Sequence, residues 1–300
     1  MEQMEDKPEF ESRLDLSVLQ GKLDAMRAEI GKVLVGQQEM VDMLLVSILS
    51  NGHVLLEGVP GVAKTLTAKL LAKVIKADFS RIQFTPDLMP SDVLGTSIFN
   101  QKKTEFEFKP GPIFSNIILI DEINRAPPKT QAALLEAMQE KQITIEGTTH
   151  KLSRPFIVLA TQNPIEYEGT YPLPEAQMDR FLIKIGVGYP DEDVEVGILQ
   201  ARADRKKDSF TVKALATPAK VVEMHKSIEE VYVKKEVMKY MVELVQSTRR
   251  DMRVAVGSSP RGSLGLFKLS RALAVLSGRD YVVPDDVKRE AIPVLGHRVI

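Results

Sequence analysis

The chain has 300 residues, with 40 basic and 41 acidic side chains and a formal net charge of −1. Hydrophobic residues make up 44% and charged residues 27%, which is typical of a folded globular protein with one large domain or two ordinary ones. Global charge therefore does not favour a nucleic-acid partner, and apolar runs such as 43–46 are far shorter than the roughly 20 residues that span a membrane.

The ends and the rare residue types restrict the possibilities further. No cysteine is present, so the sequence offers neither a disulfide nor a thiolate metal site, and a cytoplasmic location is expected. Residues 1–13 are polar and charged and predict a loose tail rather than a secretory signal. The histidines lack metal-ligand spacing and are expected to be structural or exposed: His53, His150, His225 and His297.

The periodicity of apolar residues predicts an α/β region followed by a helical region. Amphipathic helices are expected at 22–32 and 38–50. Alternating strands and helices follow, which predicts a parallel sheet with helices on both faces. The strands are expected at 53–57, 80–84, 116–120, 156–161 and 181–185, and the helices at 64–76, 128–141 and about 174–179.

A turn at 188–191 separates this region from a purely helical one. We therefore expect a tail over 1–13, an α/β core over 14–190 and a helical domain over 191–300. Two inserts in the core, 97–108 and 143–152, alternate in hydrophobicity about central turns and predict β-hairpins. The C-terminal helices are expected at 192–205, 220–230, 235–249, 263–277 and 284–295.

Residues 58–65, Gly-Val-Pro-Gly-Val-Ala-Lys-Thr, directly follow the first predicted strand. A glycine-rich turn between a strand and a helix points backbone N–H groups and the positive helix end at one place, where nucleotide phosphates bind. Lys64 is expected to reach the β- and γ-phosphates and Thr65 to ligate Mg²⁺. The strict pattern has glycine where this chain has Ala63, which should be tolerated if it adopts helical backbone angles. The candidate nucleotide-binding residues are Gly58, Val59, Pro60, Gly61, Val62, Ala63, Lys64, Thr65 and Leu66.

A second motif, Ile-Ile-Leu-Ile-Asp-Glu at 117–122, has the form of a buried parallel strand that ends in two acids. Asp121 is expected to hold Mg²⁺, directly or through water. Glu122 is expected to orient and polarise the attacking water. Acids commonly end strands, so this motif alone is ambiguous, but the two motifs together predict nucleotide hydrolysis.

By these two motifs and several further segments, the chain resembles the MoxR family of AAA+ ATPases over nearly its whole length. The resemblance implies a P-loop AAA+ core with a parallel sheet flanked by helices, followed by a small all-helical lid domain. It also implies ATP/ADP and Mg²⁺ as cofactors, a homo-oligomeric ring that is hexameric in the family, and an unidentified client protein. Further segments that match lie at 119–131, 134–140, 160–164, 175–181 and 259–261.

The resemblance assigns roles to residues outside the two motifs. Asn163, at a strand end, resembles sensor 1, which would contact the γ-phosphate or the attacking water. Arg180 resembles the arginine finger, which enters the neighbouring subunit's site, so an isolated monomer should hydrolyse ATP poorly. Arg261, at the start of a lid helix, resembles sensor 2; the sequence leaves open whether it acts on its own subunit's nucleotide or a neighbour's.

Three further assignments rest on the resemblance alone. Arg125 is a weaker candidate for facing a neighbour. The two hairpins match insertions of the AAA+ branch that contains MoxR, the magnesium chelatases and several DNA-acting motors. They make Phe99, Phe106 and the pair 102–103 (Lys-Lys) candidates for client contact, with ordinary packing and solvation as the alternative. The residues expected near adenine are Val35, Gly36 and Gln37.

Three functions follow as hypotheses. The first is a chaperone-like remodelling ATPase, an oligomeric ring that activates partner proteins. The second is a nucleic-acid motor with the same catalytic residues, which the near-neutral charge disfavours. The third is a non-hydrolysing nucleotide switch, which the presence of the full catalytic set disfavours.

Overall fold

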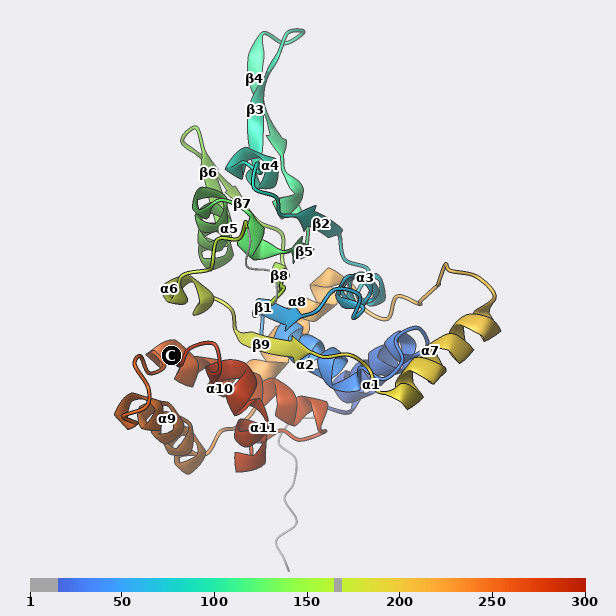
Figure 1. Ribbon diagram of the computed structural model, residues 1–300, viewed down its shortest axis with the longest axis vertical. Coiled ribbons are helices and arrows are strands. Elements are labelled where there is room, and N and C mark those ends of the chain that lie inside the picture. Colours follow the sequence, from blue (N-terminus) through green and yellow to red (C-terminus); the bar gives the residue numbers. More distant parts are fainter. Residues whose placement is uncertain (1–15, 165–168) are drawn as a thin grey trace, which may run out of the picture.

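The structure is a computed structural model that describes residues 16–164 and 169–300, so the predicted tail over 1–13 lies outside the described residues. Two N-terminal helices, an α/β region and a helical C-terminal region follow one another in the expected order (Figure 1). The first two helices, α1 (Ser17–Gly31) and α2 (Gln38–Leu49), lie below the sheet in this view.

A five-stranded parallel sheet forms the centre of the α/β region, with strand order β2-β5-β8-β1-β9. Parallel pairing brings the carboxyl ends of the strands to one edge, where ligands of such sheets bind. The predicted strands are confirmed, with boundaries that shift by one or two residues. They are β1 (Val54–Gly58), β2 (Phe79–Gln83), β5 (Ile117–Asp121), β8 (Ile157–Gln162) and β9 (Ile183–Val187).

Both faces of the sheet are covered because successive strand side chains point to opposite sides. Leu56 and Leu119 belong to one core, which they share with α1, α2 and α3 (Lys64–Val74). Leu55 and Ile118 belong to a second core, which α5 (Pro128–Glu140) covers. Burial on both faces explains why these strands read as continuous apolar runs.

The two inserts form antiparallel hairpins as predicted. They consist of β3 (Gly95–Asn100) with β4 (Glu105–Pro110), and β6 (Gln142–Ile145) with β7 (Thr148–Lys151). The first hairpin projects far beyond the sheet (Figure 1). The sequence reading missed the short helix α4 (Pro90–Leu94) before it and the single turns Pro112–Phe114 and Ile123–Arg125, which are too short for a periodic signal.

The C-terminal region is helical throughout its regular elements. Its helices are α7 (Glu192–Arg205), α8 (Pro218–Glu229), α9 (Lys235–Arg250), α10 (Pro260–Leu276) and α11 (Pro284–Leu295), after the short α6 (Glu175–Met178). Helices α8 and α10 begin earlier than the expected 220 and 263, because each starts with a proline after a capping side chain, Thr217 or Ser259. Helices α8 and α10 pack on α2, so the core below the sheet continues into this region.

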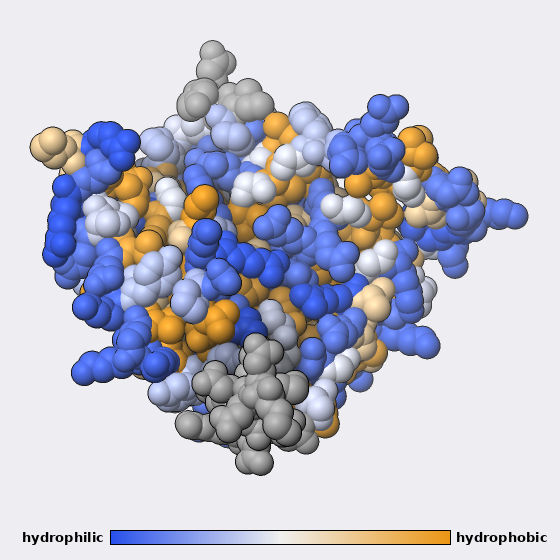
Figure 2. All heavy atoms as spheres, turned by 90° about the horizontal axis from the view of Figure 1, so that it is seen from below, coloured by the Kyte–Doolittle hydropathy of each residue, from blue (hydrophilic) through white to orange (hydrophobic). Residues whose placement is uncertain are grey.

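The face seen from below is mostly hydrophilic, with smaller hydrophobic areas between the charged side chains (Figure 2). Within the described ranges, no helix is both long and apolar enough to cross a membrane.

Two buried histidines predict a measurable acid sensitivity. Burial lowers the pKa of His53 and of His297 to about 4, because the charged ring would lose its hydration. The unfolded chain therefore binds more protons between about pH 4 and 6.5, so the free energy of unfolding falls as the pH drops through this window. Each histidine contributes up to about 1.4 kcal/mol per pH unit there.

The comparison of wild type with His53→Gln isolates one of these groups. His53 donates to Met138 O and accepts from Val158 N at 3.0 Å, and a glutamine amide can make similar bonds without titrating. Buried Glu290, whose pKa burial raises, has the opposite pH dependence in both proteins and cancels in the difference. Urea unfolding between pH 7.5 and 4.5 should give a shallower slope for His53→Gln, and equal slopes would contradict the prediction.

Candidate nucleotide-binding site

The glycine-rich loop joins β1 to α3 at the carboxyl edge of the sheet, as the sequence predicts. Strand β1 ends at Gly58, where an added β-carbon would lie 2.3 Å from the carbonyl oxygen of Val187 on the neighbouring strand. Gly61 has φ +88°, a conformation that suits glycine. Helix α3 begins at Lys64, so its free N–H groups face the loop.

The prediction that Ala63 adopts helical backbone angles is wrong. Ala63 is the N-cap of α3 and has φ +61° and ψ +16°, which is the left-handed and not the right-handed helical region. A residue with a β-carbon loses roughly 1–2 kcal/mol there relative to the right-handed region. Ala63 is therefore in a strained backbone conformation. The strict pattern has glycine at this position because glycine adopts positive φ without that strain.

Lys64 lies against the loop that it follows. Its ammonium donates to Gly58 O at 2.6 Å. Burial lowers the pKa of Lys64, and attraction to Asp121 and Glu122 partly opposes that effect. Since a phosphate oxygen attracts an ammonium more strongly than a neutral carbonyl does, a bound nucleotide would draw this side chain away from Gly58.

Asp121 ends β5 and is buried. Its Oδ2 accepts from Arg81 Nε at 2.6 Å, and its Oδ1 accepts from Thr161 Oγ1 at 3.3 Å. Arg81 comes from β2 and Thr161 from β8, the two strands that flank β5. The carboxylate is thus oriented from both sides.

Glu122, the next residue, has φ +59°, a left-handed conformation that is uncommon for this residue type and occurs more often at functional sites. Its Oε2 accepts from Gln83 Nε2 at 2.8 Å and lies 3.2 Å from Arg125 Nε. Its backbone N–H donates to Thr161 Oγ1 at 2.9 Å. Among the described residues, both of these side-chain contacts are made by Oε2, so Oε1 could accept a hydrogen bond from a water molecule.

One cavity of about 390 Å³ unites both motifs. Asn163, which follows β8 and is buried, also lines it. Gly58, Val59 and Val62 lie in the loop but do not line this cavity. The other lining residues are Pro60, Gly61, Ala63, Lys64, Thr65, Leu66, Arg81, Gln83, Asp121, Glu122 and Thr161.

The donor set of the cavity fits Mg²⁺. The Thr65 hydroxyl and the Asp121 carboxylate are hard oxygen donors in the same cavity. No group of three or more His, Asp or Glu side chains that could hold a metal occurs in the part of the chain that the structure describes. Mg²⁺ in nucleotide sites needs none, because phosphates and water supply most of its ligands.

The segment expected near adenine lies beside the loop but lines a different cavity. Gln37 Nε2 donates to Val62 O at 3.4 Å, which connects this segment to the loop. Gly36, with φ +76°, packs so closely on α7 that a β-carbon would lie 2.2 Å from Val194 Cγ1. Gly36 and Gln37 line a cavity of about 360 Å³ together with residues after β9, including Tyr189.

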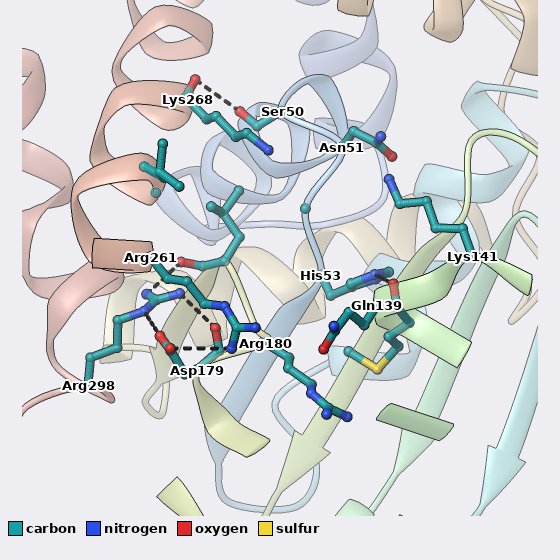
Figure 3. A pocket seen from close by; sticks show the side chains of 15 residues that line it. Ser50, Asn51, His53, Gln139, Lys141, Asp179, Arg180, Arg261, Lys268 and Arg298 are labelled. Carbon is teal, nitrogen blue, oxygen red and sulfur yellow. Dashed lines mark hydrogen bonds and ion pairs between the residues drawn. The ribbon is translucent and has the colours of Figure 1, made fainter. Parts of the chain in front are cut away.

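Arg180 and Arg261 lie together in another cavity, of about 250 Å³ (Figure 3). It shares no lining residue with the 390 Å³ cavity described above, which we call the Lys64 cavity. Arg180 follows α6, and its Nε is buried without a hydrogen-bond partner within 16–164 and 169–300. Arg261 lies in the first turn of α10 with its side chain 50% exposed. Lys141 and Lys268 line the same cavity, so its polar lining is rich in cations.

The sequence reading missed Arg81, Gln83 and Thr161. Arg81 and Gln83 alternate along β2 and so point to the same side, which is the available sequence signal. That signal identifies a polar face of β2 but does not show which strand lies beside it, because the sequence of one strand does not reveal the order of strands in a parallel sheet. For Thr161 the available signal is its position, two residues before the candidate Asn163 at the end of the same predicted strand.

Comparison with known proteins gives consistent matches. A family model for the ATPase family associated with various cellular activities (AAA) matches residues 53–183, and a model for the AAA lid domain matches residues 246–300. Chaperone MoxR1 of Mycobacterium tuberculosis is 46% identical over 281 residues, 91% of this chain and 74% of that protein. The uncharacterized protein YeaC of Bacillus subtilis is 49% identical over 271 residues, 90% of this chain and 84% of its own. A crystal structure from Cytophaga hutchinsonii has a TM-score of 0.88 at 46% identity and covers 95% of this chain and 89% of its own.

Proposed function

The chain belongs to the MoxR family of AAA+ ATPases, and we propose that it hydrolyses ATP with Mg²⁺ as an oligomeric ring that remodels or activates a partner protein. The observation that carries this proposal is the meeting of Lys64, Asp121, Glu122 and Asn163 around one cavity at the carboxyl edge of the sheet. We further propose 14–190 as the nucleotide-binding unit and 191–300 as the lid, and a cytoplasmic location.

In this mechanism the loop N–H groups and Lys64 bind the phosphates. Thr65 and Asp121 would hold the Mg²⁺, which supplies charge neutralisation at the β- and γ-phosphates. Glu122 accepts a hydrogen bond from the attacking water and aligns it with the γ-phosphate, while Asn163 contacts the same phosphate or water. Gln83 and Arg125 keep the Glu122 carboxylate in place.

Arg180 and Arg261 would serve a neighbouring subunit. Their separation from the Lys64 cavity supports action in trans for both. A guanidinium beside the transferring phosphoryl group offsets the charge that develops there. Each nucleotide would then be hydrolysed between two chains, and the ring, a hexamer by family analogy, would be the active form.

The projecting hairpin β3–β4 would contact the client. Phe99 and Phe106 pair with ring centroids 5.3 Å apart, yet they are 50% and 69% exposed, so they do not serve the core. Exposed aromatic side chains at the end of a projecting element suit contact with another protein.

The test is the specific ATPase activity as a function of protein concentration, with oligomer size measured by light scattering and Lys64→Ala as the background control. Because a shared site needs two chains, activity per subunit should rise with concentration as oligomers form. Activity that does not vary with concentration would contradict the ring. Zero turnover in formed oligomers would favour the nucleotide switch, and stimulation by DNA that weakens steeply with salt would favour the nucleic-acid motor.

A further inference from the structure

Asp179, directly before Arg180, is contacted by three side chains from the C-terminal helical region: Ser259, and also Arg261 and Arg298, which Figure 3 shows beside it. Its Oδ1 accepts from Arg298 Nε at 2.7 Å. Its Oδ2 accepts from Ser259 Oγ at 2.9 Å and lies 3.5 Å from Arg261 Nη1. One carboxylate thus joins the start of α10 and the segment after α11 to the segment that carries Arg180.

Arg298 also holds the backbone on both sides of Arg180. Its Nη2 donates to Phe181 O at 2.6 Å and to Asp179 O at 3.3 Å, and its Nη1 donates to Leu182 O at 3.1 Å. The Arg298 side chain is only 3% exposed. A guanidinium this deeply buried requires both a carboxylate and carbonyl acceptors, so its position is tightly determined.

Ser259 connects the same carboxylate to the helix of Arg261. It caps α10, and its Oγ accepts from the backbone N–H of Arg261 at 3.1 Å while it donates to Asp179. The backbone of Arg261 is therefore two hydrogen bonds away from Asp179. Any shift of α10 relative to α6 must break or carry along this connection.

The Arg180 side chain has a buried atom without a hydrogen bond among the described residues. In the part of the chain that the structure describes, its Nε has no hydrogen-bond partner. The direction of its side chain therefore depends on how its backbone is held. Misplacement of a catalytic group by about 1 Å can cost on the order of 10²-fold in rate.

We propose that Asp179 and Arg298 are positioning residues that hold Arg180 and Arg261 as one rigid pair facing the nucleotide of a neighbouring subunit. This inference rests on the proposed trans action of the two arginines. It adds that the lid and Arg180 move together, because the lid residues 259, 261 and 298 all bind the residue that precedes Arg180. A lid movement in one subunit would then change hydrolysis in the next.

The experiment compares Asp179→Asn with Asp286→Asn as a matched control. Asp286 forms a similar buried ion pair, 2.6 Å from Arg279 Nη2, and also accepts from Val283 N, and both of these partners lie in the proposed lid. We expect Asp179→Asn to lower kcat by roughly 10–10²-fold, with binding of a fluorescent ATP analogue to its own intact loop little changed. Asp286→Asn should lower the melting temperature but keep kcat near that of the wild type.

Mixing separates a positioning role from a structural one. Lys64→Ala subunits carry an intact Arg180 and Arg261, so adding them to Asp179→Asn should partly restore turnover. Adding Arg180→Ala subunits should not. Full activity of Asp179→Asn, failure of Lys64→Ala to restore it, or an equal loss in Asp286→Asn would each overturn the inference.

Two further variants keep the test decisive if Asp179→Asn does not fold. Ser259→Ala removes one hydrogen bond to the Asp179 carboxylate without removing a charge, and it should lower kcat about 3- to 10-fold, restorable by mixing with Lys64→Ala. Arg298→Lys keeps the positive charge but loses the planar set of guanidinium donors that binds Asp179 and the backbone around Arg180. It should also lower kcat, and mixing with Lys64→Ala should restore part of the activity. Wild-type kcat in both would overturn the inference. If Arg180→Ala itself retained full activity, the proposed shared site would fail instead.

Discussion

Replacing Glu122 with Gln is expected to lower ATP turnover by about 10²–10⁴-fold while ATP binding is retained, because the amide cannot polarise the attacking water as the carboxylate does. The glutamine has the same shape, so Gln83 and Thr161 still find partners near position 122. Phosphate release measures turnover, and equilibrium binding of a fluorescent ATP analogue measures the occupied fraction.

The control for this variant is Glu136→Gln, an exposed glutamate of α5 outside the Lys64 cavity. It should have wild-type turnover and affinity. If Glu122→Gln hydrolysed ATP at the wild-type rate, the assigned role of Glu122 would be wrong. If it lost ATP binding as well, the carboxylate would act in nucleotide binding rather than in the chemical step.

Replacing Arg180 with Ala is expected to lower kcat by about 10³–10⁵-fold, the range known for arginine fingers in related phosphoryl-transfer systems. Arg180 does not line the cavity of Lys64, and its proposed role is in a neighbouring subunit, so the variant should keep an intact nucleotide cavity of its own. Mixing Arg180→Ala with Lys64→Ala should therefore restore part of the activity, since some interfaces combine an intact loop with an intact Arg180.

The matched control is Arg250→Ala, an exposed arginine at the end of α9 whose side chain donates to Gln246, one turn earlier in the same helix. It should leave kcat unchanged. Loss of activity in Arg180→Ala without recovery on mixing would indicate a role within its own subunit. Unchanged activity at every concentration would mean a self-contained site, and the ring proposal would have to be withdrawn.

Much of the fold could be predicted because its signals are local. Residues 117–121 are apolar without interruption since both sheet faces are covered, and such a run is recognisable in the sequence alone. The starts of α8 and α10 differ from the prediction because the helical period becomes visible only after the first turn. The caps Thr217 and Ser259 and the prolines that follow them were the better signals.

The candidate site could be predicted where one motif carries its own geometry, as in 58–65. The parts of the site whose geometry depends on tertiary packing could not be predicted from the sequence. The left-handed backbone of Ala63 follows from the path of the loop, which residue preference does not reveal. Arg81 meets Asp121 only because β2 lies beside β5, and Arg298 meets Asp179 from 119 positions away in the chain.

Helix α2 has a consequence for how the protein responds to its ligand. Every residue from Met40 to Leu49 is buried, because the helix lies between the sheet and the C-terminal helices α8 and α10. If the sheet or the C-terminal helices moved away from α2, apolar side chains of α2 would be exposed to water. If ATP binds at the loop as proposed, we expect the C-terminal helices α8 and α10 to gain protection from hydrogen exchange, because α2 connects them to the sheet.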